Sequence, residues 1–356
     1  MAIEWLAGNR LRGTTAERPA LGLPSGSVGG WVELGRTTLS ASTSGDIVVS
    51  GLADKRYYMV LMDQQASGVV RPNIRLNTDT GSNYSYRYSG NGAADSTGTS
   101  TTLAEISNNE SNNLPQFSIA YLSNLSSKEK LGISHTMYGG SGAGTAPQRT
   151  ETVFKHAQTS NPISSFSLYN DKAGDWNTDS EVVVLGWDPD DTHTTNFWEE
   201  LASVELSSAG DNLGSGTFTA KKYLWIQVFL KASGTYNTRF RVNSDSGSNY
   251  AVRWNANGGS DNPDTSQSAF YPIVDGATTN ITTNSFMNMF IMNNTSNEKL
   301  IMWNGTVQNT AGAGNAPSRS EQVHKWANTS SQITSMQLVT GSGNFTGGRI
   351  KVWGAN

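Results

Sequence analysis

Apolar and polar residues alternate with a period of two in short runs, which are separated by clusters of Gly, Asn, Asp and Ser. The clearest case is the polar stretch Asn77–Asn83 (NTDTGSN), which lies between the alternating runs Ile74–Leu76 and Tyr84–Tyr88. This pattern predicts two antiparallel strands joined by a turn, in which Asn and Asp side chains cap backbone amides and glycine supplies positive φ. No segment has a convincing helical period, so the sequence predicts an all-β protein.

The same turn returns as Asn243–Asn249 (NSDSGSN), followed by the alternating run Tyr250–Trp254. The offset between the two copies is 249 − 83 = 166 residues. Other blocks match as well: Trp31–Leu34 with Trp198–Leu201, Arg56–Met62 with Lys222–Leu230, Lys128–Leu131 with Asn297–Leu300, Gly142–Arg149 with Gly312–Arg319, and Val182–Trp187 with Ile350–Trp353. The chain is therefore a tandem duplication, with repeats at 31–187 and 198–356, a linker at 188–197 and an unmatched N-terminal segment at 1–30.

The runs Arg56–Met62 and Lys222–Leu230 are apolar on both faces, so each is predicted to be a central strand buried on both sides. Each copy holds about eight to ten short strands, one at each end of the repeat, with long crossings between them, which favours a jelly roll over an immunoglobulin-like sandwich. The polar stretches Gly90–Ser100 and Asn255–Ser268 are predicted to be loops. We therefore expect two tandem jelly-roll β-sandwiches, in contact because the linker is short, preceded by an extended N-terminal arm.

Composition narrows the class of partner. The chain has no cysteine, which excludes disulfides and cysteine zinc sites. Its formal charge is −4, and Lys and Arg are scattered singly, so nucleic acid is not an expected partner. No run of 18 apolar residues exists and the chain opens on Met1–Glu4 (MAIE), so we expect neither a membrane partner nor a signal peptide. A low charged fraction of 15% with abundant Ser, Thr, Asn and Gly is common in extracellular and virion β-proteins.

The segment 1–30 is too rich in Gly and Pro to form a packed domain by itself. It is either a frayed terminus or an arm that docks on a neighbouring subunit. In the second case, apolar side chains would make the contact and arginines would pair with carboxylates there. The residues of this assembly arm are Ile3, Trp5, Leu6, Arg10, Leu11 and Arg12.

The repeated turn places oxygen-bearing side chains at alternate positions, as calcium loops do. It lacks the downstream bidentate glutamate and the acid density of an EF-hand. A self-capped turn is therefore the prediction, and calcium bound at Asp79 and Asp245 is the alternative. No other metal site and no cofactor is expected.

The titratable residues give no support to catalysis. The four histidines are not matched between the copies, since His156 aligns with Trp326 and His324 with Phe154. This excludes a histidine site common to both repeats. Glu151 and Glu321 lie two residues after Arg149 and Arg319, on the same face of a strand, and are expected to form ion pairs with them. We expect no catalytic residue.

Aromatic side chains offer the best argument for ligand binding. Tyr84, Tyr86 and Tyr88 project to one face of their strand, and they would stack on sugar rings if that face were exposed. Ser85 and Arg87 indicate that the other face of the strand is exposed to solvent. The prediction is therefore that the tyrosines are buried. The candidate positions for glycan stacking are Tyr84, Trp254 and Trp303.

Three segments together resemble virion structural proteins of tailed bacteriophages, particularly marine ones: 1–13 (MAIEWLAGNRLRG), 31–39 (WVELGRTTL) and 79–87 (DTGSNYSYR). The resemblance implies concanavalin-like jelly rolls in head decoration, fibres or tail, and no catalytic residues. It leads us to expect a non-enzymatic capsid decoration, knob or fibre subunit, assembled in the host cytoplasm and exposed on the particle surface. The expected partners are the major capsid protein or other virion proteins and further copies of this chain. The alternative is a carbohydrate-binding, receptor-recognition protein of a tail fibre, with a cell-surface glycan as its partner.

Overall fold

The computed structural model describes residues 30–107, 111–188, 196–232, 238–271, 284–308, 312–341 and 343–356. Within these segments all regular structure is β, and no helix is present that is long and apolar enough to cross a membrane. The six residues assigned to the assembly arm, and most of the predicted linker, lie outside the described residues.

The strands of the first repeat are β1 (Val32–Thr38), β2 (Ile47–Ser50), β3 (Tyr57–Gln64), β4 (Ala66–Ser67), β5 (Val69–Val70), β6 (Pro72–Leu76), β7 (Tyr84–Gly90), β8 (Ser96–Thr101), β9 (Ala104–Glu105), β10 (Ser111–Asn112), β11 (Gln116–Ser123), β12 (Lys130–Tyr138), β13 (Gln148–His156), β14 (Ser165–Asn170), β15 (Asp175–Trp176) and β16 (Glu181–Trp187). The strands of the second repeat are β17 (Glu199–Glu205), β18 (Asn212–Thr217), β19 (Tyr223–Ala232), β20 (Thr238–Val242), β21 (Tyr250–Ala256), β22 (Asn262–Gln267), β23 (Asn284–Met292), β24 (Lys299–Val307), β25 (Ser318–Trp326), β26 (Ser335–Thr340) and β27 (Phe345–Ala355).

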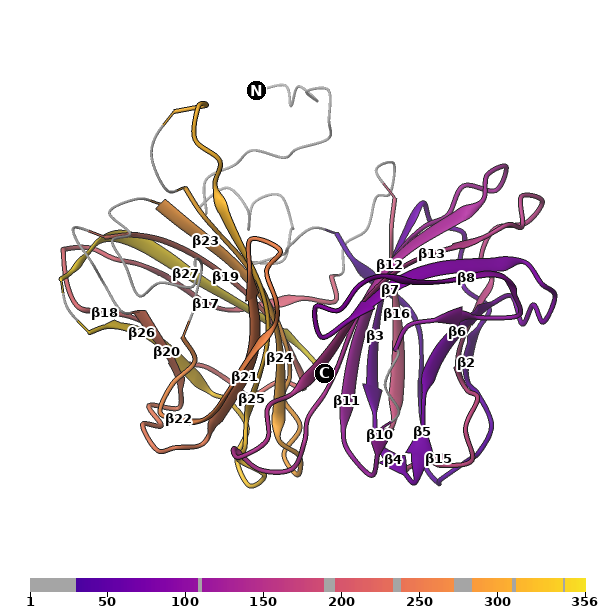
Figure 1. The fold of residues 1–356 in the computed structure, drawn as a ribbon, viewed down its shortest axis with the longest axis horizontal. Helices are drawn as coiled ribbons and strands as arrows, with labels where there is room; N and C mark the ends of the chain where they lie inside the picture. The colour runs from indigo at the N-terminus through magenta and orange to yellow at the C-terminus, as the bar shows by residue number, and fades with distance from the viewer. Residues whose placement is uncertain are drawn as a thin grey trace, which may run out of the picture.

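Each repeat is a sandwich of one large and one small antiparallel sheet (Figure 1). The large sheet has eight strands in the order β1-β16-β3-β11-β12-β13-β7-β8 in the first repeat and β17-β27-β19-β23-β24-β25-β21-β22 in the second. The small sheets are β2-β14-β6-β9 and β18-β26-β20, and the first repeat adds the two-stranded pairs β10-β5 and β15-β4. Because the strand order is the same in both, positions of the two repeats can be matched strand by strand. The predicted fold, two tandem jelly-roll β-sandwiches, is confirmed.

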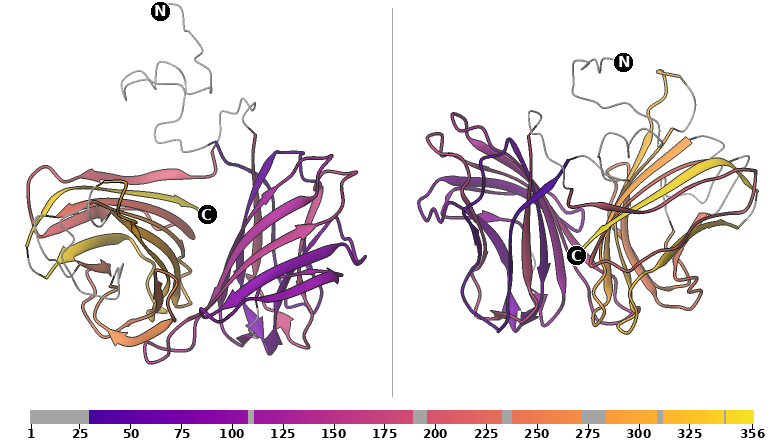
Figure 2. Two further views of the ribbon diagram at one scale, coloured as in Figure 1. Left: turned by 45° about the horizontal axis from the view of Figure 1, so that its top comes forward. Right: turned by 180° about the vertical axis from the view of Figure 1, so that it is seen from behind.

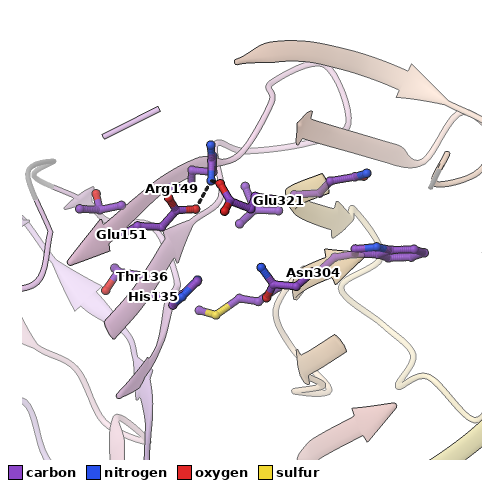
Figure 3. A pocket seen from close by; sticks show the side chains of 11 residues that line it. His135, Thr136, Arg149, Glu151, Asn304 and Glu321 are labelled. Atoms are coloured by element: carbon purple, nitrogen blue, oxygen red, sulfur yellow. Dashed lines mark hydrogen bonds and ion pairs between the residues drawn. The ribbon is translucent and has the colours of Figure 1, made fainter. Parts of the chain in front are cut away.

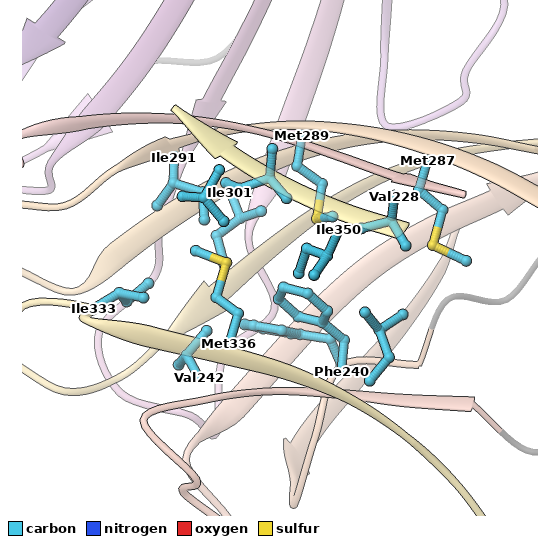
Figure 4. Close-up of a cluster of buried hydrophobic side chains, with 14 of the residues drawn as sticks. Val228, Phe240, Val242, Met287, Met289, Ile291, Ile301, Ile333, Met336 and Ile350 are labelled. Carbon is cyan, nitrogen blue, oxygen red and sulfur yellow. The ribbon is translucent and has the colours of Figure 1, made fainter. Parts of the chain in front are cut away.

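A separate hydrophobic core fills each sandwich. Alternate residues of β3, among them Tyr58, Val60 and Met62, point into the first core and are almost fully buried. The second core is built in the same way, and Figure 4 shows Phe240 and Met336 of the small sheet packed against methionine and isoleucine side chains of the large one. Period-two burial is what a sheet with one face on a core requires.

A third apolar cluster joins the two repeats. It is formed by the outer faces of the two large sheets, which lie toward each other between the sandwiches (Figures 1 and 2). Met59 and Leu61, on the outer face of β3, are 2% and 0% exposed because the second repeat covers them. The prediction that the sandwiches touch is therefore confirmed. Burial on both faces is confirmed for Tyr58–Gln64 of β3, where the other repeat is the second cover, but it is wrong for the matching strand β19, since Phe229 on its outer face is 45% exposed.

Two predictions of local structure were wrong. The stretches Gly90–Ser100 and Asn255–Ser268 contain the edge strands β8 and β22, paired with β7 and β21. Their Ser, Thr and Asn side chains suit a solvated sheet edge and hide the strand signal. The closing strands also match in another register than the tryptophans suggest. Gly186 is equivalent to Gly354, since a Cβ at either position would strike the equivalent leucine and lysine of its own repeat.

Candidate functional site

The repeated turn is held together by its own aspartate. The Asp79 carboxylate accepts hydrogen bonds from the Gly81 amide (2.7 Å), the Asn83 side chain (2.8 Å) and His156 Nε2 (2.8 Å). Burial opposes ionisation of Asp79, but the hydrogen bonds from His156, Asn83 and Gly81 outweigh it and lower the pKa of this carboxyl. The predicted self-capped turn is confirmed.

The second copy of the turn uses a different third donor. Asp245 accepts from the Gly247 amide (2.8 Å), the Asn249 side chain (2.9 Å) and Trp326 Nε1 (2.7 Å). The exchange of His156 for Trp326 therefore keeps a ring N–H directed at the carboxylate. In the part of the chain that the structure describes, no group of three or more His, Cys, Asp and Glu side chains is gathered to hold a metal ion.

The aromatic candidates for glycan stacking separate by burial. Tyr84 is 0% and Trp303 is 1% exposed, so a sugar cannot reach either ring, and these two assignments were wrong. The reason is that β7 and β24 turn these side chains toward the sandwich core, where the Tyr84 hydroxyl accepts a hydrogen bond from the Leu76 amide (2.9 Å). Trp254 is half-buried, and its indole N–H donates to Asp264 on the edge strand β22 (2.9 Å).

The three described histidines lie far apart along the chain, and each is in a different environment. His324 is fully buried in the second core, where burial lowers its pKa to about 3 and neither ring nitrogen has a hydrogen-bond partner. His156 belongs to the turn, and His135 lines a pocket between the repeats. His193 lies outside the described residues.

That pocket brings together charged side chains from both repeats (Figure 3). Arg149 of β13 is 5% exposed and makes a two-point contact with Asp261, from the segment before β22, with nitrogen–oxygen distances of 2.9 and 2.7 Å. It also pairs with Glu151 on its own strand and lies 3.6 Å from Glu321 of β25. The predicted pairs Arg149–Glu151 and Arg319–Glu321 are both present. One arginine thus serves three carboxylates, two of them from the other repeat.

The surroundings of Glu151 raise its pKa. Burial raises the pKa of Glu151 to about 7, with the neighbouring charges of Glu321 and Asp261 adding to the shift and Arg149 opposing it. Burial also lowers the pKa of His135, which lines the same pocket. Such shifts are found in catalytic sites and also in structural ion-pair networks.

The enclosed space at this cluster is small. The cavity has a volume of about 10 Å³, which is room for about one water molecule and not for a sugar or a peptide. The Glu151 and Glu321 side chains that border it remain 30 and 23% exposed. The ion pairs of Arg149 with Asp261 and Glu321 form a polar cross-link between the repeats, and Glu151 can take up or release a proton beside it.

A second buried cluster ties the repeats together on another side of the interface. The Lys222 ammonium lies 3.0 Å from Asp63 and 3.2 Å from Glu181, both of the first repeat. The Tyr223 hydroxyl donates to Glu181 (2.8 Å), and the Asn294 side chain donates to Asp63 (2.8 Å). Burial works against the charge on Lys222, but the two carboxylates outweigh it and raise the pKa of this lysine.

Sequence reasoning found the Arg149–Glu151 pair but missed the partners from the other repeat in both clusters, because Asp261, Asp63 and Lys222 have no oppositely charged partner nearby along the chain. The available signal was the apolar outer face of Arg56–Met62, which shows that something covers that side of the sheet. It does not show what the cover is.

No protein-family model matches the chain, and no curated protein matches it. Among solved structures, the chain is similar to the LG1-3 region of the laminin alpha2 chain, with 6% identity and a TM-score of 0.22, over 90% of this chain and 62% of that one. It thus spans less than two thirds of that laminin region. It is also similar to domains LG4-5 of the mouse laminin alpha1 chain, with 8% identity, a TM-score of 0.20 and 90% coverage of both chains. Likenesses this distant carry no argument about function.

Proposed function

We propose that this chain is a non-enzymatic structural subunit of a tailed-phage virion, a capsid decoration, knob or fibre subunit exposed on the particle surface. The observation that supports this most is the inter-repeat interface. An apolar cluster flanked by buried ion pairs joins the two sandwiches into one unit. A passive, solvent-facing part of a particle needs such rigidity, and lasting interfaces are generally apolar at their centre.

The charged pocket does not argue for an enzyme. Its carboxylates and His135 surround a cavity of about 10 Å³, whereas ligand pockets usually measure several hundred Å³. The resemblance of segments 1–13, 31–39 and 79–87 to phage virion proteins is the reason for proposing that the particle is a phage virion. The arm at 1–30 would bind the major capsid protein or another virion protein during assembly in the host cytoplasm, with no nucleic acid, membrane or cofactor involved.

The test is incorporation into particles. Removal of residues 1–30 should leave a folded, soluble protein that no longer joins the virion. A variant of the full chain, Trp5→Ala with Leu6→Ala and Leu11→Ala, should lose incorporation in the same way, while Thr14→Ala with Thr15→Ala, in the same segment, should keep it. Cryo-EM of the particle would then show paired sandwich lobes on the head or the fibre. Normal incorporation of the truncated protein would contradict the arm.

A second candidate, recognition of a cell-surface glycan by a tail fibre, rests on Trp254. This ring keeps part of its surface in solvent beside the Asp264 carboxylate, and tryptophan faces are used to stack on sugars. We expect Trp254→Ala to abolish binding on a glycan array if this function holds, and Tyr88→Ala, at the equivalent position of the first repeat, to keep it. No binding by the intact protein would end this candidate.

A further inference from the structure

Large apolar side chains are exposed on only two surfaces of the described chain. The first, here called the repeat-1 face, lies on the outer side of the first large sheet and the turn before β12; the second, the repeat-2 face, lies on the outer side of the second large sheet. The repeat-1 face consists of Tyr57, Leu125, Leu131, Ile133 and Val153, which are 38 to 57% exposed. The repeat-2 face contains Phe229 and Phe286, which are 45 and 42% exposed.

Strand register places three residues of the repeat-1 face, and both of the repeat-2 face, side by side. Ile133 of β12 stands directly opposite Val153 of β13, with Leu131 two residues away on the same side of β12. Phe229 of β19 stands directly opposite Phe286 of β23. Exposed apolar groups that gather in this way mark interaction sites, whereas scattered ones need no explanation.

The duplication shows what normally covers such a face. The equivalents of Leu131, Ile133 and Val153 in the second repeat are Leu300, Met302 and Val323, by strand order and register. These three residues are 0 to 5% exposed, because they pack in the cluster that joins the repeats. The repeat-1 face is therefore the same sheet face that is covered in the second repeat.

The other side of the internal contact has an exposed counterpart too. Phe117 of β11 is 1% exposed in the joint cluster, and its equivalent on β23 is Phe286, at 42%. The internal interface thus joins two different regions of the outer sheet face, the region around Met302 in the second repeat and the region around Phe117 in the first. The region equivalent to that of Met302 stays uncovered on the first repeat, and the region equivalent to that of Phe117 stays uncovered on the second. An interface that joins two different regions in this way is a head-to-tail contact.

A loop of the first repeat also forms polar contacts across the internal interface. The segment 139–147 of the first repeat crosses to the second, where the Gly142 amide donates to Glu298 (2.6 Å) and Lys325 lies 3.0 Å from the same carboxylate. Arg253 donates to the Pro147 carbonyl (2.8 Å), and the Ser266 amide donates to the Ala143 carbonyl (2.8 Å). Lys325 also donates to the Gly140 carbonyl, so the loop contacts four residues of the second repeat.

Every one of these groups has an exposed equivalent. The repeat-2 copy of the loop, 312–317 (GAGNAP), is exposed along its whole length. In the first repeat, Glu129 and Lys155 form an ion pair that is 41 and 46% exposed, whereas Glu298 and Lys325 are 11 and 0% exposed. Arg87 and Ser100, the equivalents of Arg253 and Ser266, are exposed as well. Ser100 even keeps the positive φ of Ser266, at 53° against 52°.

We propose that a second copy of this chain docks its repeat-2 face and loop 312–317 onto the repeat-1 face and its Glu129–Lys155 pair. The intermolecular contact reuses the geometry of the internal one, so copies add head to tail, into a ring if the rotation closes and into a filament if it does not. This inference does not depend on the proposed virion function, since it follows from the duplication and the exposed faces alone.

The contact between copies should be weaker than the internal one. Inside the molecule, Lys222 binds Asp63 and Glu181. In the contact between copies, the equivalent position is occupied by Arg56 of the first repeat. The positions of Asp63 and Glu181 are occupied by Phe229 and Arg349 in the second repeat. The buried ion pairs of that corner are thus lost between copies, and the association should depend on protein concentration.

The test is sedimentation velocity on the full chain over a hundredfold range of concentration. The wild type should rise from the monomer mass of 38.2 kDa to at least twice that mass. Ile133→Asp with Val153→Asp should hold the protein at the monomer mass, and so should Phe229→Asp with Phe286→Asp. The control is Ser44→Asp with Ser50→Asp, two exposed positions at the small sheet of the first repeat, which should associate like the wild type. Far-ultraviolet circular dichroism of each variant shows whether it is folded.

Mixing the two monomeric variants tests the direction of the contact. Each keeps one intact face, so an equimolar mixture should form a species of two chains and no larger one. A wild type that stays monomeric throughout, or one whose association survives both double substitutions, would overturn the proposal. A mixture that remains monomeric would overturn the head-to-tail arrangement.

Discussion

At the scale of single residues, the two repeats solve the same packing problem with different side chains. Gly132 of β12 stands opposite Phe154 of β13, and in the second repeat Ile301 stands opposite His324. A large ring faces a glycine, and a smaller ring faces an isoleucine. Sequence comparison showed the exchange of His324 and Phe154 but not its partner, because the cross-strand pairing is set by the register of the whole sheet.

This pairing predicts that Gly132 tolerates no side chain. A Cβ at this position would lie 2.2 Å from the Phe154 ring, so we expect Gly132→Ala to lower the free energy of unfolding by about 1–3 kcal/mol. Gly144, with open space around it, is the control, and Gly144→Ala should change stability by less than about 0.5 kcal/mol. Urea denaturation of the two variants would measure the difference, and equal stabilities would contradict the prediction.

Glu151 predicts a dependence of stability on pH. Its pKa in the folded protein, about 7, is above the ordinary value of 4.5, so the folded state holds this proton more tightly than the unfolded one. The contribution of this group to stability is therefore present below pH 4.5 and is lost as the pH rises through 7.

Glutamine mimics the protonated form of this residue. We expect Glu151→Gln to stabilise the protein at pH 8 by roughly 1–2 kcal/mol, allowing for the 30% exposure of the side chain, and to have little effect at pH 5. Thermal unfolding at both pH values measures this. Glu129→Gln, in an exposed ion pair, is the control, and a variant that is less stable than wild type at pH 8 would refute the assignment.

At the scale of elements, the turn between the paired strands was the most predictable part of the fold. Its Asn, Asp and Gly act locally, so the sequence specified the caps at Asp79 and Asp245 directly. Another repeated feature, a β-bulge, could not be predicted from the sequence. β1 and β17 carry a bulge at the same place, between Glu33 and Gly35 and between Glu200 and Ala202. A bulge leaves no clear mark in the pattern of side chains.

The caps predict a cost for removing either aspartate. Asp79→Ala and Asp245→Ala each leave three donors without their acceptor, so each should lower the free energy of unfolding by about 1–3 kcal/mol at pH 7. Since the pKa of both carboxyls is lowered in the folded state, this contribution is present above pH 4 and disappears as the pH falls further. Asp95→Ala, which removes an exposed ion pair with Arg87, should have an effect of at most about 0.5 kcal/mol. Chemical denaturation at pH 7 and pH 3 distinguishes these outcomes.

At the scale of the whole molecule, the joint apolar cluster predicts that the two sandwiches unfold together. Met302, 5% exposed in that cluster, and Ile133, 52% exposed, occupy equivalent positions and form a matched pair. Met302→Asp buries a charge without a partner and should lower the stability by at least about 3 kcal/mol or split the melting transition in two. Ile133→Asp should leave a single transition near that of the wild type. Differential scanning calorimetry is the measurement, and identical traces for the two variants would contradict the joint cluster.

The sequence by itself determined the period-two alternation, the two-fold repeat, the self-capped turns and the all-β class, because each depends on residues close together along the chain. The tertiary structure alone decided which sheet faces meet, since Arg149 and Asp261 are brought together by the docking of one repeat on the other. It also decided that Ile133 is exposed while Met302 is buried, although both lie in the same pattern on equivalent strands. Burial of a sheet's outer face depends on what lies against it, and a duplicated sequence specifies that face twice while a single internal contact covers it once.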